Sequence, residues 1–354
     1  MTAFLRRAYH SARRAHRSTA RFFQRHFFLG RLFQLVFILL GVTFFTFIVT
    51  SAAPSDAAEM YYLSRGITPS ETLLASTRAE MGLDAPVLVR YLRWLISALQ
   101  GDLGQSYQFS ESVLTQLSRK LPATLILAGG ALVLALAVAF PIGILCAVKK
   151  DRIPDVLFRV ISLGGISLPN FWLALILLYV FAVQLHWFPV IGNGDLKSMV
   201  LPAMTLAIPL AGSYIRQIRT AALEELGKEY VSGLRAKGIP SRTILFRHVL
   251  PGLMLPMITL ISLSAGHLLG GAAIVETIFG WPGIGSMVVD SIRVRDYPVI
   301  QGYVIWMAVI YLLTGLFSDA VCRLLDPQFR ASLRIGRHIR GRMLSRTKRK
   351  AAKE

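Results

Sequence analysis

The few residues in this chain that could do chemistry are concentrated in one charged segment, EYVSGLRAKGIPSRTILFRHVLP, at residues 229–251. The segment lies between two long apolar runs, which contain almost no side chain able to transfer a proton, attack a bond or hold a metal ion. Force or a partner must therefore act on the chain at the charged segment. This pattern favours a driven membrane protein over an enzyme.

Motifs of common enzyme and nucleotide sites are missing from the sequence. We find no G-x-x-x-x-G-K-[ST] phosphate loop, and neither H-E-x-x-H nor G-x-S-x-G occurs. The glycines of FGWPGIGS at 279–286 lack a phosphate-binding lysine and predict a tight outer turn. We expect no catalytic residue, no cofactor, and a transport subunit that is not itself an enzyme.

Metal ligation by the protein is also poorly supported. Of the seven histidines, only His186 and His267 fall outside the predicted cytoplasmic segments. Neither has an imidazole, thiolate or carboxylate nearby at ligand spacing. The two cysteines lie at predicted cytoplasmic helix ends, where thiols stay reduced. We therefore predict no metal site.

Three polar residues inside the apolar runs, Asn170, Ser264 and His267, are candidates for lining a translocation path. The His267 ring either packs against a neighbouring helix or faces a water-lined path. Asn170 follows Pro169, so its amide either satisfies backbone groups freed by a kink or contacts a ligand. The apolar cores otherwise lack the ionisable groups of proton- or sodium-coupled carriers, which leaves an ion-coupled secondary transporter as a less favoured alternative.

The composition requires a membrane. The 354 residues are 54% hydrophobic and 16% charged, whereas soluble domains carry about 25% charged residues. A helix of about 20 apolar residues spans a bilayer and pairs its own backbone groups. The predicted spans are residues 32–54, 121–148, 160–185, 198–217, 250–275 and 298–320. The fourth is the weakest, because it is short and carries two prolines.

The distribution of Lys and Arg predicts that both termini are cytoplasmic. The first 31 residues carry eight Arg and no acid, and the segment after the sixth span is similarly basic. The net charge of +20 lies mainly in these two tails. We expect the tails to contact anionic membrane lipid, and we expect no nucleic-acid partner.

The long outer segment after the first span contains two predicted helices. Thr68 is the expected cap of a helix that starts at the next proline and ends at Gly82. Asp84 is the expected cap of a second helix, which Gly101 ends. This second helix should lie at the membrane interface, with Trp94 among the lipid headgroups.

The charged segment itself predicts two helices and a tight turn. Gly238 supplies the left-handed residue at the end of the first helix, Pro240 prevents its continuation, and a second helix restarts at Ser241. A solvated connector is the plain alternative. The first helix is indicated by apolar residues at helical spacing, namely Leu223, Leu226, Tyr230 and Leu234.

The same segment carries a specific resemblance. EYVSGLRAKG followed by HVLP resembles the cytoplasmic loop of ATP-binding-cassette (ABC) importer permeases of the dipeptide, oligopeptide and nickel family. The resemblance continues, in order, through GDLGQSY, LPATLILAG, SLPNFWLAL, LLGGAAIVETIFGWPGIG, RDYPVIQG and DPQFR. It implies an all-α protein of a bacterial inner membrane, with six transmembrane helices and a cytoplasmic coupling-helix hairpin at 222–249.

The implied organisation is a permease domain at 31–330 between basic cytoplasmic tails at 1–30 and 331–354, whose roles stay open. The implied partners are a homologous second permease, two cytoplasmic ATP-binding subunits that hydrolyse ATP, and an extracytoplasmic solute-binding protein. The hairpin would insert into a groove of an ATP-binding subunit. Its implied coupling residues are Glu229, Tyr230, Leu234, Arg235, Ala236, Lys237, Gly238, His248 and Pro251.

Two further segments, LASTRAEMGLDAPVLVRYLRWL and LPATLILAGGALVL, are most similar to nickel permeases. They imply nickel or a metal chelate as the substrate. A dipeptide or oligopeptide is the alternative, because this family carries all these substrates on one scaffold.

Overall fold

A computed structural model describes residues 33, 36–52, 57–63, 65–109 and 111–325. Within these ranges the regular structure is helical, apart from one isolated bridge between Gln105 and Ser112. The predicted basic tails lie outside the described residues. The chain divides into unit 1, residues 1–113 and 294–308, and unit 2, residues 114–293 and 309–354.

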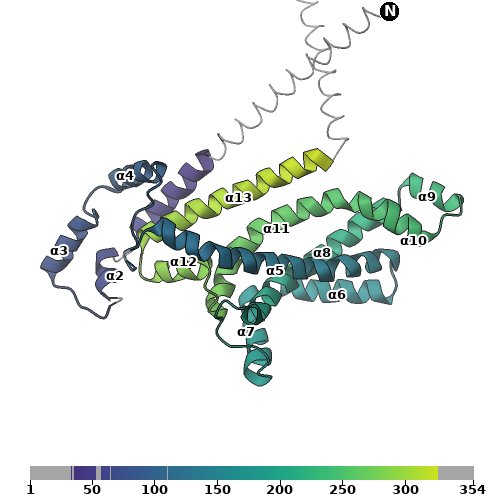
Figure 1. The fold of residues 1–354 in the computed structure, drawn as a ribbon, viewed down its shortest axis with the longest axis horizontal. Helices are drawn as coiled ribbons and strands as arrows, with labels where there is room; N and C mark the ends of the chain where they lie inside the picture. Colours follow the sequence, from purple (N-terminus) through teal and green to yellow (C-terminus); the bar gives the residue numbers. More distant parts are fainter. Residues whose placement is uncertain (1–32, 34–35, 53–56, 64, 110, 326–354) are drawn as a thin grey trace, which may run out of the picture. The chain divides into compact units, whose positions relative to one another are not determined.

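Unit 2 is built from long apolar helices (Figure 1). The predicted hairpin joins α8 to α11, and α12 and the second part of α13 follow in the same unit. In chain order the elements are α5 (Val113–Val148), α6 (Ile153–Ser167), α7 (Asn170–Leu177), the π-helix η1 (Leu178–Gln184), α8 (Leu196–Leu226), α9 (Glu229–Ala236), α10 (Ser241–Ile244), the π-helix η2 (Leu245–Val249), α11 (Leu250–Phe279), α12 (Ile284–Arg293) and α13 (Tyr297–Leu325).

In the described part, four helices are long and apolar enough to cross a membrane, and the number rises to six if each of two bent helix pairs is one span. The predicted second, fourth, fifth and sixth spans correspond to α5, α8, α11 and α13. The predicted first span appears as the shorter apolar helix Val36–Ser51. An all-α fold with several membrane-crossing helices is therefore confirmed.

The third predicted span is not one straight helix. The chain bends by 101° between α6 and α7. Leu168 has an extended backbone, with ψ 127°, because the ring of Pro169 disfavours a helical conformation in the residue before it. The π-helix η1 then continues α7 to Gln184.

The fourth predicted span is the opposite case. It was expected to be short and weak, but α8 runs without a break through Pro202 and Pro209. Tertiary packing explains this, because α8 lies between α6 and α11 and buries nearly half of its residues. Small residues permit the close approach, and a Cβ added to Gly212 would lie 2.7 Å from the Ser162 carbonyl oxygen.

The glycine cluster after α11 forms the predicted tight turn, with Gly280 left-handed at φ +64°. The sequence did not predict α12, which follows at once. The fully buried Glu276 fixes this junction, because its carboxylate accepts hydrogen bonds from Thr124 Oγ1 at 2.7 Å and from Ser286 N at 2.9 Å. Thr124 Oγ1 also accepts a hydrogen bond from Ile284 N at 2.9 Å, so α12 is fastened to α5.

Unit 1 contains the helix Val36–Ser51, α2 (Ala57–Leu63), α3 (Glu71–Glu80), α4 (Val87–Leu99) and the start of α13. Both outer helices exist, and both stop where predicted, before Gly82 at φ +65° and before Gly101 at φ +87°.

Their predicted caps were wrong. Ser70 caps α3 through a hydrogen bond from Leu73 N, so this helix starts two residues later than expected from Thr68. The residue before α4 is Pro86, which makes no side-chain cap, and Asp84 lies two residues before this cap position.

Candidate functional site

The hairpin at residues 227–249 is the first candidate site. The periodicity predicted one helix from Leu223 to Leu234, but α8 ends at Leu226 and α9 begins only at Glu229. Gly238 has φ +74° and turns the chain, as predicted, and α10 restarts at Ser241 after Pro240. No atom lies within 4 Å of a Cβ added to Gly238, so the backbone conformation alone requires glycine.

A small apolar cluster holds the hairpin together. Val231 and Val249 are completely buried and Ile244 is almost so, which brings one residue each from α9, η2 and α10 into contact. The surrounding half-buried side chains are those of Leu226, Leu234, Ile239 and Leu245. Leu234, which was expected to pack into a partner's groove, thus lies against the hairpin's own core.

A polar contact spans the break between α8 and α9. The Tyr230 hydroxyl donates a hydrogen bond to Glu225 Oε1 at 2.7 Å, and Lys228 Nζ donates one to Glu225 Oε2. Partial burial and the neighbouring carboxylate raise the pKa of Tyr230 to about 12. A Cβ added to Gly252 would lie 2.6 Å from Glu225 Cδ, so the start of α11 also packs on this carboxylate.

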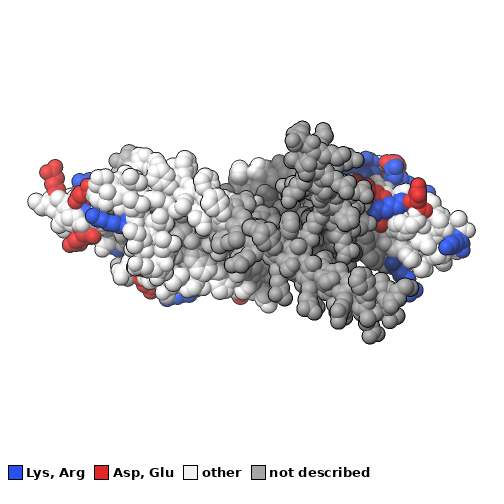
Figure 2. Space-filling view, turned by 90° about the horizontal axis from the view of Figure 1, so that it is seen from above, with Lys and Arg blue, Asp and Glu red and all other residues white. Residues whose placement is uncertain are grey.

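Most of the predicted coupling residues are exposed on the surface of the hairpin. Figure 2 shows Lys, Arg, Asp and Glu side chains gathered at the end of unit 2 that carries α9 and α10. His248 and Leu234 are half-buried. The exposed members are Glu229, Tyr230, Arg235, Ala236, Lys237, Gly238 and Pro251.

A hollow of about 470 Å³ lies between the ends of α5 and α8 and the start of α10. Leu226, Ile244 and Leu245 contribute to its apolar wall, whereas Lys150, Arg235 and Arg242 supply positive charge. An apolar wall with positive charge beside it is complementary to a partner's segment that carries both acidic and apolar side chains.

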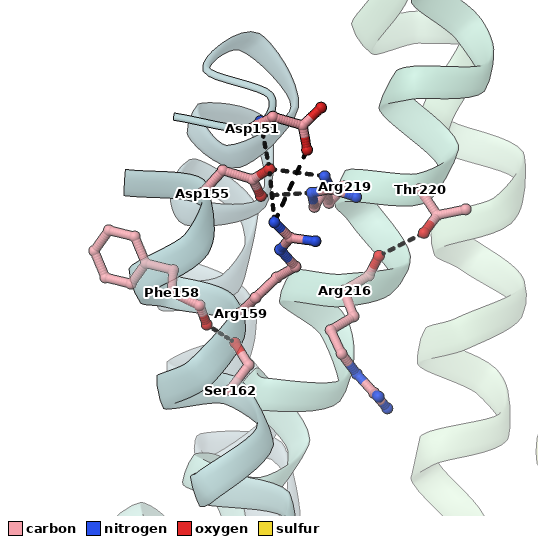
Figure 3. A network of polar contacts seen from close by, with 8 residues as sticks. All are labelled: Asp151, Asp155, Phe158, Arg159, Ser162, Arg216, Arg219 and Thr220. Atoms are coloured by element: carbon pink, nitrogen blue, oxygen red, sulfur yellow. Dashed lines mark hydrogen bonds and ion pairs between the residues drawn. The ribbon is translucent and has the colours of Figure 1, made fainter. Parts of the chain in front are cut away.

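The buried pair Asp155 and Arg219 fastens α6 to α8 (Figure 3). The sequence analysis did not find it. Arg219 Nε and Nη2 donate hydrogen bonds of 2.6 and 2.7 Å to the two carboxylate oxygens of Asp155. Arg159 lies 3.7 Å from the same carboxylate, and Asp151 N donates a hydrogen bond to it at 2.9 Å.

The second candidate site is a cavity of about 520 Å³ inside unit 2. Asn170 from α7 and Ser264 from α11 both line it, so the structure brings together two of the three predicted path residues. The side chain of His267 lies outside the described residues. The other polar lining residues are Ser213, Tyr214 and Gln217 of α8, which the sequence analysis missed.

The described lining of the cavity is mostly apolar and carries five uncharged polar side chains. Its described lining consists of hydroxyl, amide and apolar side chains. In the part of the chain that the structure describes, no group of three or more His, Cys, Asp and Glu residues could hold a metal ion.

Two family models match the chain. The binding-protein-dependent transport system inner membrane component covers residues 139–331, and its N-terminal companion covers residues 24–128. Among curated relatives, the "Probable D,D-dipeptide transport system permease protein DdpB" of Escherichia coli (strain K12) is 36% identical over 84% of this chain and 95% of its own. The glutathione transport system permease protein GsiC of Salmonella paratyphi A is 33% identical over 86% of this chain and 99% of its own.

The fold has a solved counterpart. A chain of the inward-facing MetNI methionine ABC transporter matches with a TM-score of 0.51 and 18% identity, over 60% of this chain and 97% of that one. The chain belongs to the family of binding-protein-dependent transport system inner membrane components. It is a membrane permease subunit of an ABC importer.

Proposed function

We propose that this permease carries short peptides, and that the hairpin α9–α10 receives the movement of an ATP-binding subunit. The proposal rests first on the similarity to dipeptide and glutathione permeases along nearly the whole chain. Nickel, which the resemblance favoured, has no support from these relatives. The peptide alternative is therefore the better supported substrate.

The 520 Å³ cavity suits a peptide. Asn170 and Gln217 offer amide donors and acceptors, and Ser213 and Ser264 offer hydroxyls. Such groups match the N–H and C=O groups of a peptide. A nickel ion prefers imidazole or thiolate ligands, and the described lining of this cavity contains neither.

The hairpin suits a partner at the membrane surface. Val231 and Ile244 are buried in its own apolar core, and Arg235 and Lys237 are exposed. A partner can therefore contact Arg235 and Lys237 without unfolding the hairpin. The basic hollow beside it gives a docking segment both apolar and charged contacts. The docking partner in this proposal is one of two ATP-binding subunits, on the cytoplasmic face.

The complete importer in this proposal contains a second, homologous permease and a solute-binding protein on the outer face. This chain forms half of the translocation path and has no ATPase activity of its own. In this proposal both termini are cytoplasmic, which the basic tails at both ends support.

Reconstitution tests the substrate. The chain, purified together with its partner subunits and placed in liposomes, should accumulate a labelled dipeptide only when ATP and the binding protein are present. Asn170→Ala should reduce this uptake, whereas Asn193→Ala, in a loop away from the cavity lining, should not. ATP-driven uptake of nickel without uptake of dipeptide would overturn the proposal.

A further inference from the structure

A small cavity in unit 1 has no role in the translocation path described above. Its volume is about 180 Å³, room for about six water molecules at about 30 Å³ each. It lies between the end of the helix Val36–Ser51, α4 and the start of α13. The lining residues that matter here are Arg90, Arg93, Trp94, Tyr107 and Gln301.

Two of these side chains carry polar atoms that are buried and lack a hydrogen-bond partner. Gln301 is 1% exposed, and neither its Nε2 nor its Oε1 is hydrogen-bonded. Trp94 Nε1 is likewise buried without a partner. Buried polar groups in proteins are nearly always paired, so two unpaired donors and one acceptor on a single cavity indicate a polar ligand.

The charges on the cavity indicate that the ligand is an anion. Arg90 and Arg93 both line it, and no carboxylate does. The nearby Asp296 is not among the lining residues; its Oδ2 accepts hydrogen bonds from Ser106 Oγ and Gln108 N, and its Oδ1 is buried without a hydrogen-bond partner. Burial raises the pKa of Tyr107 to about 12, so its hydroxyl keeps its proton at neutral pH.

The position of α4 indicates where such an anion comes from. Its exposed apolar residues recur at helical spacing along one side, and in a membrane subunit such a stripe lies on lipid. The four most exposed are Leu88, Leu92, Ile96 and Leu99, at 57, 47, 57 and 81%, and Val87 and Val89 are exposed by 38 and 37%.

Tyr91 attaches α4 to the helix Val36–Ser51. Tyr91 is buried, and its hydroxyl lies 3.1 Å from Thr43 Oγ1 on the helix Val36–Ser51. The Tyr91 ring also packs edge-on against Phe47, with the ring centroids 5.6 Å apart. The cavity therefore lies at the edge of a helix that rests on the membrane surface, at the level of the headgroups.

We propose that this cavity binds the phosphodiester of a phospholipid headgroup. Arg90 and Arg93 pair with the phosphate oxygens, since guanidinium groups match phosphate geometry. Trp94 Nε1 and Gln301 Nε2 donate hydrogen bonds to the same group. Gln301 Oε1 accepts a hydrogen bond from a headgroup hydroxyl, such as those of phosphatidylglycerol. The bound lipid then holds α4 against the start of α13.

Native mass spectrometry of the full-length chain in detergent, titrated with phosphatidylglycerol, tests this site. The tightest-bound lipid should be held about tenfold more weakly by Arg90→Gln and by Gln301→Leu. Arg78→Gln, on α3 in the same unit, changes an arginine that does not line the cavity; it is the matched control and should bind lipid like the wild type.

Thermal unfolding gives a second readout that does not depend on lipid counting. Without lipid, Gln301→Leu should unfold at the same temperature as the wild type or higher, because it removes unpaired buried groups. With phosphatidylglycerol, the wild type should gain more stability than this variant. Equal lipid retention by all variants would mean that water fills the cavity and would overturn the proposal. Stabilisation by inorganic phosphate or acetate, with equal lipid retention, would assign a soluble oxyanion and also overturn it.

Discussion

Arg219 on α8 binds the carboxylate of Asp155 on α6 through two hydrogen bonds, of 2.6 and 2.7 Å. The Asp155 side chain is fully buried, and that of Arg219 is 15% exposed. Figure 3 shows the pair between the two helices, and Arg219 lies seven residues before Leu226, where α8 ends and the hairpin begins. The pair therefore fixes α8, whose last turn contains Glu225 and is followed by α9.

Asp155→Asn should destabilise the permease by about 3 kcal/mol, because removing one partner of a buried ion pair leaves the other charge uncompensated. Thermal unfolding of the purified chain in detergent measures the change.

Asp290→Asn is the matched control, since Asp290 and Arg293 form an exposed pair at 3.6 Å. Exposed pairs contribute about 0–1 kcal/mol. Equal losses for the two variants would show that the buried pair does not fasten α6 to α8.

Local signals were enough to predict parts of the hairpin. Gly238 and Pro240 mark a turn in the sequence itself, and the structure has the turn at that point. The break at Gly227 was missed, because the apolar spacing continues across it from Leu226 to Tyr230. The side chains of Lys228 and Tyr230 bind the Glu225 carboxylate across this break, and these contacts form only in the folded chain.

Contacts between residues far apart in the chain could not be predicted from the sequence. Asp155 and Arg219 are 64 positions apart, so no local periodicity joins them. The kink at Pro169 was expected from the sequence, but its angle of 101° was not. Proline alone does not decide the outcome, because α8 continues unbroken through Pro202 and Pro209. Packing around each proline decides between the two outcomes.

The coupling roles of the exposed hairpin residues stay predictions.

Gly238→Ala should loosen the hairpin. An L-residue at φ +74° costs about 1–2 kcal/mol. Amide hydrogen exchange in α9 should therefore accelerate by about fivefold or more. Gly233→Ala is the matched control, because Gly233 is helical and also has no atom within 4 Å of an added Cβ. It should leave the exchange unchanged or slow it. Identical behaviour of the two variants would contradict the strain argument.

Tyr230→Phe removes the hydrogen bond to Glu225 and with it a pH dependence. The pKa of Tyr230 is about 12 in the folded chain, against 10.0 for the ordinary group. A raised pKa favours the protonated hydroxyl in the folded state. Its contribution is therefore complete below pH 10 and is lost as the pH rises towards 12.

The difference in unfolding temperature between the wild type and Tyr230→Phe should stay constant from pH 8 to 10 and shrink above it. Tyr107, whose pKa is also about 12, titrates in both proteins and cancels from the difference. A difference that stays constant to pH 11.5 would show that the hydroxyl does not bind the carboxylate.

Thr124→Val tests how α12 is held. The Thr124 hydroxyl donates to Glu276 Oε1 and accepts from Ile284 N, and it is 1% exposed. Valine has nearly the same shape but makes neither hydrogen bond, so Glu276 Oε1 and Ile284 N each lose a partner. A buried unsatisfied group lowers the free energy of unfolding by about 1–3 kcal/mol. Thr220→Val, at an exposed position of α8, makes the same chemical change and should have little effect. Hydrogen exchange should also quicken at the first turn of α12 in Thr124→Val alone. Unchanged exchange there would mean that the turn after Gly280 holds α12 without Thr124.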